Sequence, residues 1–67
     1  MSFTIEIERE DDGRWIAEVI DLPGVMSYGD TREVAVSRAE AIALRVLADR
    51  VEESRSGDLM TVSFASA

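Results

Sequence analysis

The sequence predicts an α+β domain of β-β-β-α-β order, in which an antiparallel meander is covered by one long helix and followed by a last strand. Short stretches near both ends alternate apolar with polar residues, as half-buried strands do, and the middle repeats apolar residues at helical spacing. With 67 residues, the chain corresponds to one domain with a modest core. We therefore expect a single domain over residues 1–67, with no C-terminal DNA-binding domain.

The first strand is predicted over residues 3–8, where polar residues alternate with the apolar residues Phe3, Ile5 and Ile7. A hairpin turn follows over residues 10–13, with Gly13 placed for a positive φ. The turn is acidic but lacks the distal glutamate of an EF-hand loop, so we expect a solvated turn rather than a cation site.

The second strand is predicted over residues 14–20. One face carries Trp15, Ala17 and Val19, and the other carries Ile16, Glu18 and Ile20. Apolar side chains on both faces indicate either a central strand or a face that meets a partner. We expect Trp15 to belong to the core rather than to act as an exposed binding hot spot.

A sharp turn is predicted at Leu22-Pro23-Gly24, because proline has a fixed φ and glycine a permissive one. A short third strand is then expected over residues 25–28 and ends at Gly29. Five residues are interpreted as shaping the backbone rather than performing chemistry: Gly13, Pro23, Gly24, Gly29 and Thr31.

The helix is predicted over residues 31–54, capped by Asp30 or Thr31, with Glu33 completing a box-like pattern three residues after Asp30. Its apolar stripe consists of Ala35, Ala39, Ile42 and Val46, widened by Val36, Ala43, Leu44, Leu47 and Val51. A polar stripe on the opposite side consists of Arg38, Arg45, Asp49 and Glu52.

The helix is expected to stop near Gly57, before a last strand over residues 59–64 and a frayed tail over residues 65–67. The last strand places Met60, Val62 and Phe64 on one face. A right-handed crossover puts this strand beside the first one and parallel to it. The alternative is that it pairs elsewhere in a dimer.

Composition excludes several classes of function. The chain has no cysteine and no histidine, which rules out disulfides and cysteine-based zinc sites and removes the commonest general base and metal ligand. The net charge of −7 disfavours direct binding to DNA or RNA and suits a basic protein partner, although solubility explains it equally well. No signal peptide and no membrane span are predicted, so we expect a cytoplasmic protein.

The ordered motifs resemble those of the HicB-like antitoxin family. They are the alternating first strand, Asp12-Gly13-Arg14-Trp15, Asp21-Leu22-Pro23-Gly24, Gly29-Asp30-Thr31 with Glu33 and Ala35, and Glu40-Ala41-Ile42. The resemblance extends from about residue 3 to about residue 47 and implies a partial RNase H-like fold without the nuclease site. Family members act in type II toxin–antitoxin modules, where they block a small basic HicA toxin, an mRNA-cleaving ribonuclease with an active-site histidine.

The leading hypothesis is therefore a non-catalytic antitoxin, without cofactor or metal, that occludes a HicA-like toxin. One alternative is an orphan regulatory or interaction domain that dimerises without a toxin partner. Another is a remnant nuclease that uses Glu6 or Glu8 with Glu40. Such a nuclease needs carboxylates that converge on metal ions, whereas the strand glutamates alternate away from the face that meets the helix.

Two sets of candidate contact residues follow. The acidic cluster of Glu8, Glu10, Asp11 and Asp12 is a candidate for steering a basic toxin, with plain solvation as the alternative. Ile16, Ile20 and Phe64 are candidates for contacts in a homodimer or higher homo-oligomer, which is expected because a core of this size gives little net stability.

Overall fold

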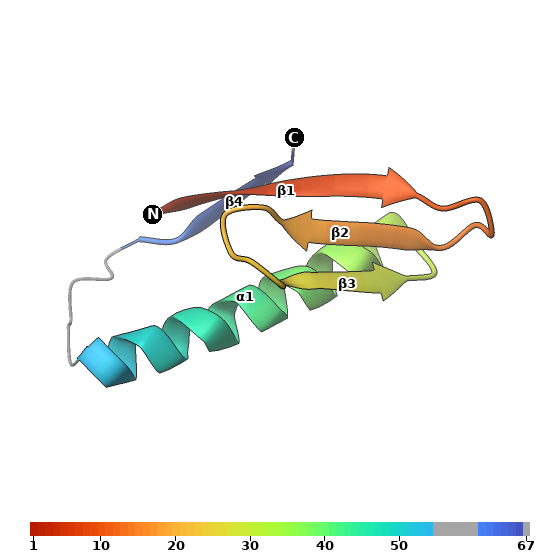
Figure 1. Cartoon of the computed structure of the whole chain (residues 1–67). Helices are drawn as coiled ribbons and strands as arrows, with labels where there is room; N and C mark the ends of the chain where they lie inside the picture. Colours follow the sequence, from red (N-terminus) through yellow and green to blue (C-terminus); the bar gives the residue numbers. More distant parts are fainter. Residues whose placement is uncertain (55–60, 67) are drawn as a thin grey trace.

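A computed structural model describes residues 1–54 and 61–66 and confirms the α+β class and the order of the elements. These elements are β1 (Ser2–Arg9), β2 (Trp15–Val19), β3 (Met26–Gly29), α1 (Arg32–Ser54) and β4 (Ser63–Ser66). The described strands form a four-stranded sheet of order β3-β2-β1-β4, and α1 lies against one face of it (Figure 1).

The strand pairing agrees with the predicted topology. Strands β1, β2 and β3 form the antiparallel meander, and β4 lies parallel to β1 at the edge of the sheet. Val19 lies opposite Ile5 in the register, and Ala17 lies opposite Ile7. These apolar positions of the hairpin therefore share the face toward α1. The parallel pairing of β1 with β4 is the arrangement that a right-handed crossover through α1 produces.

The core lies between this face and a stripe of α1 that consists of Ala35, Ala39, Ala43 and Leu47. These residues recur every fourth position and leave at most 3% of their surface exposed. The predicted stripe is therefore displaced, because Ile42 and Val46 lie only half-buried at its margin. Leu44 was wrongly assigned to it and is 49% exposed. Alanines occupy the line of closest approach because their small side chains allow the helix backbone to lie near the sheet.

The turn between β2 and β3 is built by Leu22-Pro23-Gly24, as predicted. The amide of Val25 donates to the carbonyl of Leu22 at 3.1 Å, and Gly24 has a φ of +82°. Proline followed by glycine at positive φ is the pattern of a type II turn. The Leu22 side chain is 2% exposed, so it anchors the turn in the core.

The N-terminus of α1 is capped by Thr31, whose Oγ1 accepts a hydrogen bond from the amide of Val34 at 3.1 Å. The box-like pattern predicted from Asp30 and Glu33 is wrong, because the cap is one residue later. Val34 then occupies the third helical position, and its side chain cannot return a hydrogen bond. Glu33 still lies in the first turn, where its negative charge is favourable.

Glycine is required at position 29 because the backbone of α1 lies close to it, not because the position has a positive φ. A Cβ atom at this position would lie 2.5 Å from the backbone nitrogen of Ala35, at the start of α1. In contrast, Gly13 has a φ of +89° in the β1–β2 turn, as the sequence predicted.

The C-terminal predictions are only partly correct. Residues 61 and 62 are not in a strand, and the strand continues through Ala65 and Ser66, which were expected to be frayed. Pairing with β1 holds these two residues, since Thr4 lies opposite Ala65 and Ile5 opposite Ser66. The predicted helix stop at Gly57 lies outside the described residues. So do Met60 and the start of the predicted last strand.

Replacing Gly29 with alanine is expected to lower the free energy of unfolding by about 3 kcal/mol, because the new methyl group forces α1 away from β3. Gly24→Ala is the matched control. Its Cβ meets nothing within 4 Å, so it carries only the cost of a positive φ, about 1 kcal/mol. Urea denaturation of both variants measures the difference, and equal losses would contradict the close approach.

Thr31→Ala is expected to cost about 1 kcal/mol, because the amide of Val34 loses its acceptor. Thr31→Ser keeps the hydroxyl and is expected to retain most of this energy, whereas Asp30→Ala is expected to cost much less. Thermal unfolding followed by circular dichroism checks the order. A larger loss for Asp30→Ala than for Thr31→Ala would show that the cap is misassigned.

Candidate functional site

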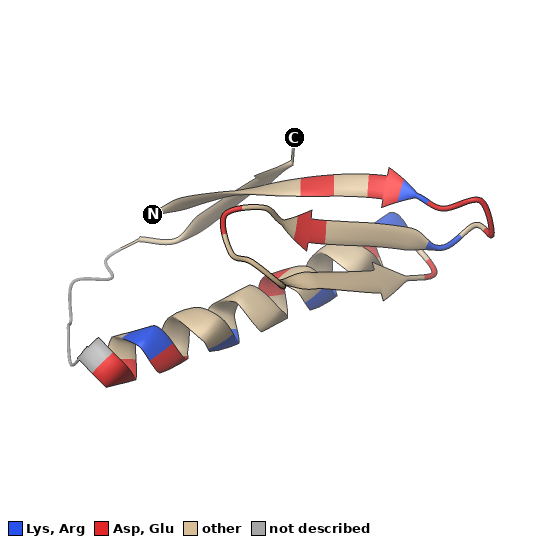
Figure 2. Ribbon diagram, in the orientation of Figure 1, with Lys and Arg blue, Asp and Glu red and all other residues tan. Residues whose placement is uncertain are grey.

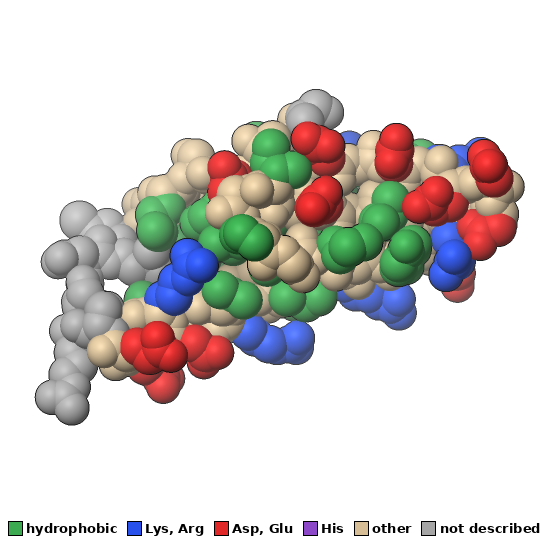
Figure 3. Space-filling model, viewed as in Figure 1, with side chains coloured by type: hydrophobic (Ala, Val, Ile, Leu, Met, Phe, Trp, Pro, Cys, Tyr) green, Lys and Arg blue, Asp and Glu red, His purple; other side chains and the backbone are tan. Residues whose placement is uncertain are grey.

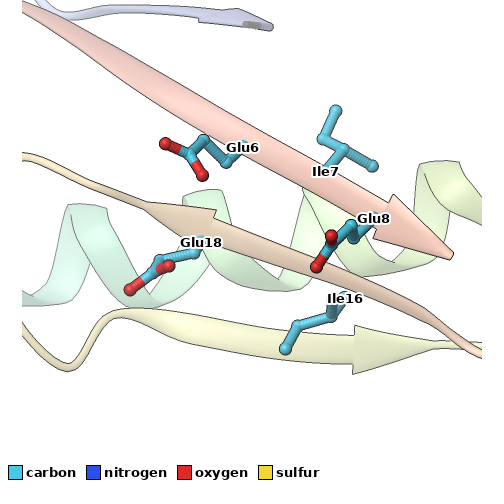
Figure 4. Close-up of a pocket in the computed structure, with 5 residues that line it drawn as sticks. All are labelled: Glu6, Ile7, Glu8, Ile16 and Glu18. Atoms are coloured by element: carbon cyan, nitrogen blue, oxygen red, sulfur yellow. The ribbon is translucent and has the colours of Figure 1, made fainter. Parts of the chain in front are cut away.

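The candidate site is the face of the sheet that α1 leaves uncovered, which we call the open face. Side chains alternate along each strand, so those between the core positions point away from the helix. The open face consists of Glu6 and Glu8 from β1, Ile16 and Glu18 from β2, Ile20 just after β2, and Met26 and Tyr28 from β3. Figure 4 shows side chains of β1 and β2 on this face, with α1 behind the sheet.

Apolar side chains make up the half of the open face nearer β3. Ile20 is 46% exposed, Met26 39% and Tyr28 40%, and Ile16 is half-buried beside them. Hydrophobic side chains gather on this side of the molecule, with acidic groups next to them (Figure 3). A contiguous exposed apolar patch with a charged border is typical of a protein-binding surface.

Carboxylates make up the half nearer β1. In the strand register Glu6 lies directly opposite Glu18, and Glu8 lies opposite Ile16. The next strand continues these rows, with Met26 opposite Glu18. The face therefore changes from acidic over β1 to apolar over β3, and β2 contributes one residue of each kind. Because like charges directly opposite each other are destabilising, the Glu6–Glu18 pair is unfavourable in the free domain.

The carboxylates border a hollow of about 300 Å³ that is lined by Glu6, Ile7, Glu8, Ile16 and Glu18 (Figure 4). Among the described residues, none of these three glutamates has an ion-pair partner. Their negative charges are therefore available to a group from outside the described part of the chain.

The described arginines do not neutralise this face. Arg14 lies at its border, where its Nε atom donates to Asp12 at 2.8 Å and its guanidinium is 4.7 Å from the centre of the Tyr28 ring. Arg9, the last residue of β1, has its guanidinium 6.0 Å from the centre of the Trp15 ring. The other described arginines, Arg32, Arg38, Arg45 and Arg50, belong to α1 on the other side of the sheet (Figure 2). Among the described residues, none of these arginines forms an ion pair with the glutamates of the open face.

The acidic cluster predicted at the hairpin is divided by the structure. Glu8 belongs to the open face, whereas Asp12 is bound to Arg14. The backbone amide of Arg14 and then its guanidinium lower the pKa of the Asp12 carboxyl below its ordinary value. Asp11 is exposed and Glu10 half-buried at the turn. Within the predicted cluster, Asp12 is therefore already engaged inside the hairpin.

The predicted oligomer contacts also separate. Ile16 and Ile20 lie on the open face, as their alternation indicated, but Phe64 faces the helix side of the sheet. Its ring centroid is 5.7 Å from that of Phe3, and it is half-buried. As predicted, Trp15 packs at the margin of the core.

Sequence reasoning missed Met26 and Tyr28 as part of this surface and did not recognise Glu6 and Glu18 as a pair. The third strand has four residues, too few for alternation to identify its faces. The pairing of two glutamates twelve positions apart depends on the register of the hairpin. The two-residue periodicity of β1 and β2 was the available signal, since it already placed both glutamates opposite the core face.

The glutamates proposed for a remnant nuclease are on different layers. Glu6 and Glu8 extend from the open face, whereas Glu40 is on α1. Within residues 1–54 and 61–66, no group of three acidic, histidine or cysteine side chains is arranged to hold a metal ion. The helical residues that the structure describes include no segment long and apolar enough to span a bilayer.

Comparisons with protein-family models, with curated proteins and with solved structures gave no match.

Neutralising Glu18 is expected to stabilise the free domain. Glu18→Gln removes the repulsion across the hairpin and is expected to raise the free energy of unfolding by roughly 0.2–1 kcal/mol at low salt, with a smaller gain at high salt. Glu6→Gln is expected to give a similar gain, and the double variant little more than either single one. Urea denaturation of this cycle measures the coupling, and fully additive gains would show that the two charges do not interact.

Proposed function

We propose that this chain is an antitoxin-like, non-catalytic domain of a type II toxin–antitoxin module, which binds and neutralises a small basic HicA-type mRNA-cleaving toxin in the cytoplasm. The observation that carries the proposal is the open face, where exposed apolar residues lie beside glutamates that have no ion-pair partner among the described residues. The motifs that resemble the HicB-like family, and the partial RNase H-like fold that they imply, supply the class of partner.

The charge of the chain suits this partner. A ribonuclease binds RNA phosphates through a positively charged surface, so it is attracted to a protein with a net charge of −7. Long-range attraction of this kind accelerates association and helps to exclude acidic partners.

The apolar part of the open face suits a lasting complex. Burial of exposed aliphatic and aromatic side chains supplies affinity that long-range charge attraction alone does not. Neutralisation then proceeds by occlusion: the folded domain covers the RNA-binding surface of the toxin together with its catalytic histidine. This mechanism requires no catalytic group, cofactor or metal from the antitoxin.

Co-expression tests the proposal. The partner is sought as a small, basic, histidine-containing protein encoded in a neighbouring reading frame. Its expression alone is expected to arrest growth and degrade mRNA, and co-expression of this chain is expected to restore growth and yield a stable complex on size-exclusion chromatography. A toxin variant without its histidine is the control for binding without toxicity.

The opposite result is equally informative. If growth arrest persists and the two proteins elute separately, the antitoxin proposal fails. A self-association of the chain without any toxin would then favour the orphan interaction domain.

A further inference from the structure

We propose that the open face docks a short amphipathic helix of the basic partner, with an arginine or lysine of that helix lying between Glu6, Glu8 and Glu18. The identity of the partner rests on the proposed function, whereas the chemistry of the docked segment follows from this surface. The apolar side of the helix packs on Ile16, Met26 and Tyr28.

The dimensions of the open face fit one helix. Neighbouring strands are about 4.8 Å apart, so β1 to β3 span about 10 Å, which is the width of an α-helix. Along the strands, the exposed positions from Glu8 to Ile20 cover four to five residues of strand, or roughly 15 Å, which corresponds to about ten residues of helix. A docked helix of this length covers both halves of the face.

The order of the side chains sets the orientation. Acidic residues lie over β1 and apolar residues over β3, with β2 carrying one of each. A helix that lies along the strands must therefore present cations on one flank and apolar residues on the other. A purely apolar segment would leave the repulsion between Glu6 and Glu18 in place. It would also replace water near the two carboxylates with low-dielectric surroundings, in which the repulsion is stronger.

The same charges argue against a second copy of this chain as the occupant. A two-fold contact through the open face would place its carboxylates either against the same carboxylates or against the apolar half of the other copy, and neither arrangement supplies a cation. Arg14, at the border of this face, is already bound to Asp12 and lies over Tyr28. The arginines of α1 reach the open face of another copy only in a head-to-tail contact, which repeats without closing.

A cation between Glu6 and Glu18 removes an unfavourable interaction and adds a favourable one. In the free domain Glu6 and Glu18 repel each other across the hairpin. A positive charge between them offsets the repulsion, so neutralising the pair should stabilise the free domain but weaken the complex. Opposite changes in stability and binding distinguish recognition by these glutamates from general damage to the fold.

The test uses a synthetic twelve-residue helical peptide of leucine, alanine and arginine, with arginine on one flank. The control peptide has glutamine in place of each arginine. Binding is followed by ¹H–¹⁵N chemical-shift changes of the whole chain. The expected changes are concentrated at residues 6–8, 16–20 and 26–28, and the arginine-free peptide is expected to bind much more weakly.

Variants of the chain provide the matched comparison. Glu6→Gln/Glu18→Gln is expected to weaken peptide binding roughly five- to tenfold, as two exposed charge pairs are lost. Glu52→Gln/Glu53→Gln changes the net charge equally on exposed residues of α1 and is expected to leave affinity within about twofold. Tyr28→Ala is expected to weaken binding, whereas Leu44→Ala, at a comparably exposed residue of α1, is not.

Four results would overturn the proposal: shift changes on α1 or at the hairpin turn, equal losses in both double variants, equal binding of the two peptides, or concentration-dependent shifts of the open face without peptide. The last result would assign the face to a second copy of the chain.

The toxin assay separates this inference from the proposed function. If the peptide maps to the open face but no toxin is neutralised, the antitoxin proposal fails and the chemistry of the surface is supported. If a toxin is neutralised equally well by the wild type and by Glu6→Gln/Glu18→Gln, the antitoxin proposal is supported and the docking surface is overturned.

Discussion

The close approach of α1 to the sheet is the constraint on which the rest of the structure depends. Gly29 lies against the backbone of Ala35, and Ala39 and Ala43 continue this line along the helix. These three alanines have no exposed surface. Without larger side chains between the layers, the helix packs directly on β2 and β3, and Leu22 and Val25 close the core at the turn. A single helix held in this way covers one face of the sheet and leaves the other uncovered.

The uncovered face differs from an ordinary solvated sheet surface. An antiparallel sheet with one exposed side usually carries polar residues there. Here Met26 and Tyr28 are exposed on β3, and Glu6 and Glu18 face each other across β1 and β2. Each feature is unfavourable for an isolated domain, since one leaves apolar area in water and the other sets like charges together. Both become favourable when a basic, partly apolar partner covers the surface, which is the physical basis of the proposed function.

The open face has a direction of its own, because it changes from acidic over β1 to apolar over β3. The glutamates of the open face lack a described ion-pair partner, whereas the described arginines belong to α1 or, like Arg14, are engaged near the hairpin. In the hairpin, Asp12 is neutralised locally, although its place in the sequence suggested that it belongs to one acidic cluster with Glu8. The number of acidic residues in the turn therefore overstates the charge that is available there to a partner. The glutamates of the strands are more available than their separate places in the sequence suggest.

Local patterns in the sequence determined the α+β class, the order of the elements, the positive φ of Gly13 and the turn at Leu22-Pro23-Gly24, because periodicity and turn chemistry act between near neighbours. Only the tertiary structure decided the rest. Capping by Thr31 and the close approach at Gly29 depend on where the helix meets β3. The displaced stripe of α1, the extension of β4 and the pairing of Glu6 with Glu18 depend on helix packing and strand register, which arise from contacts between segments distant in the chain.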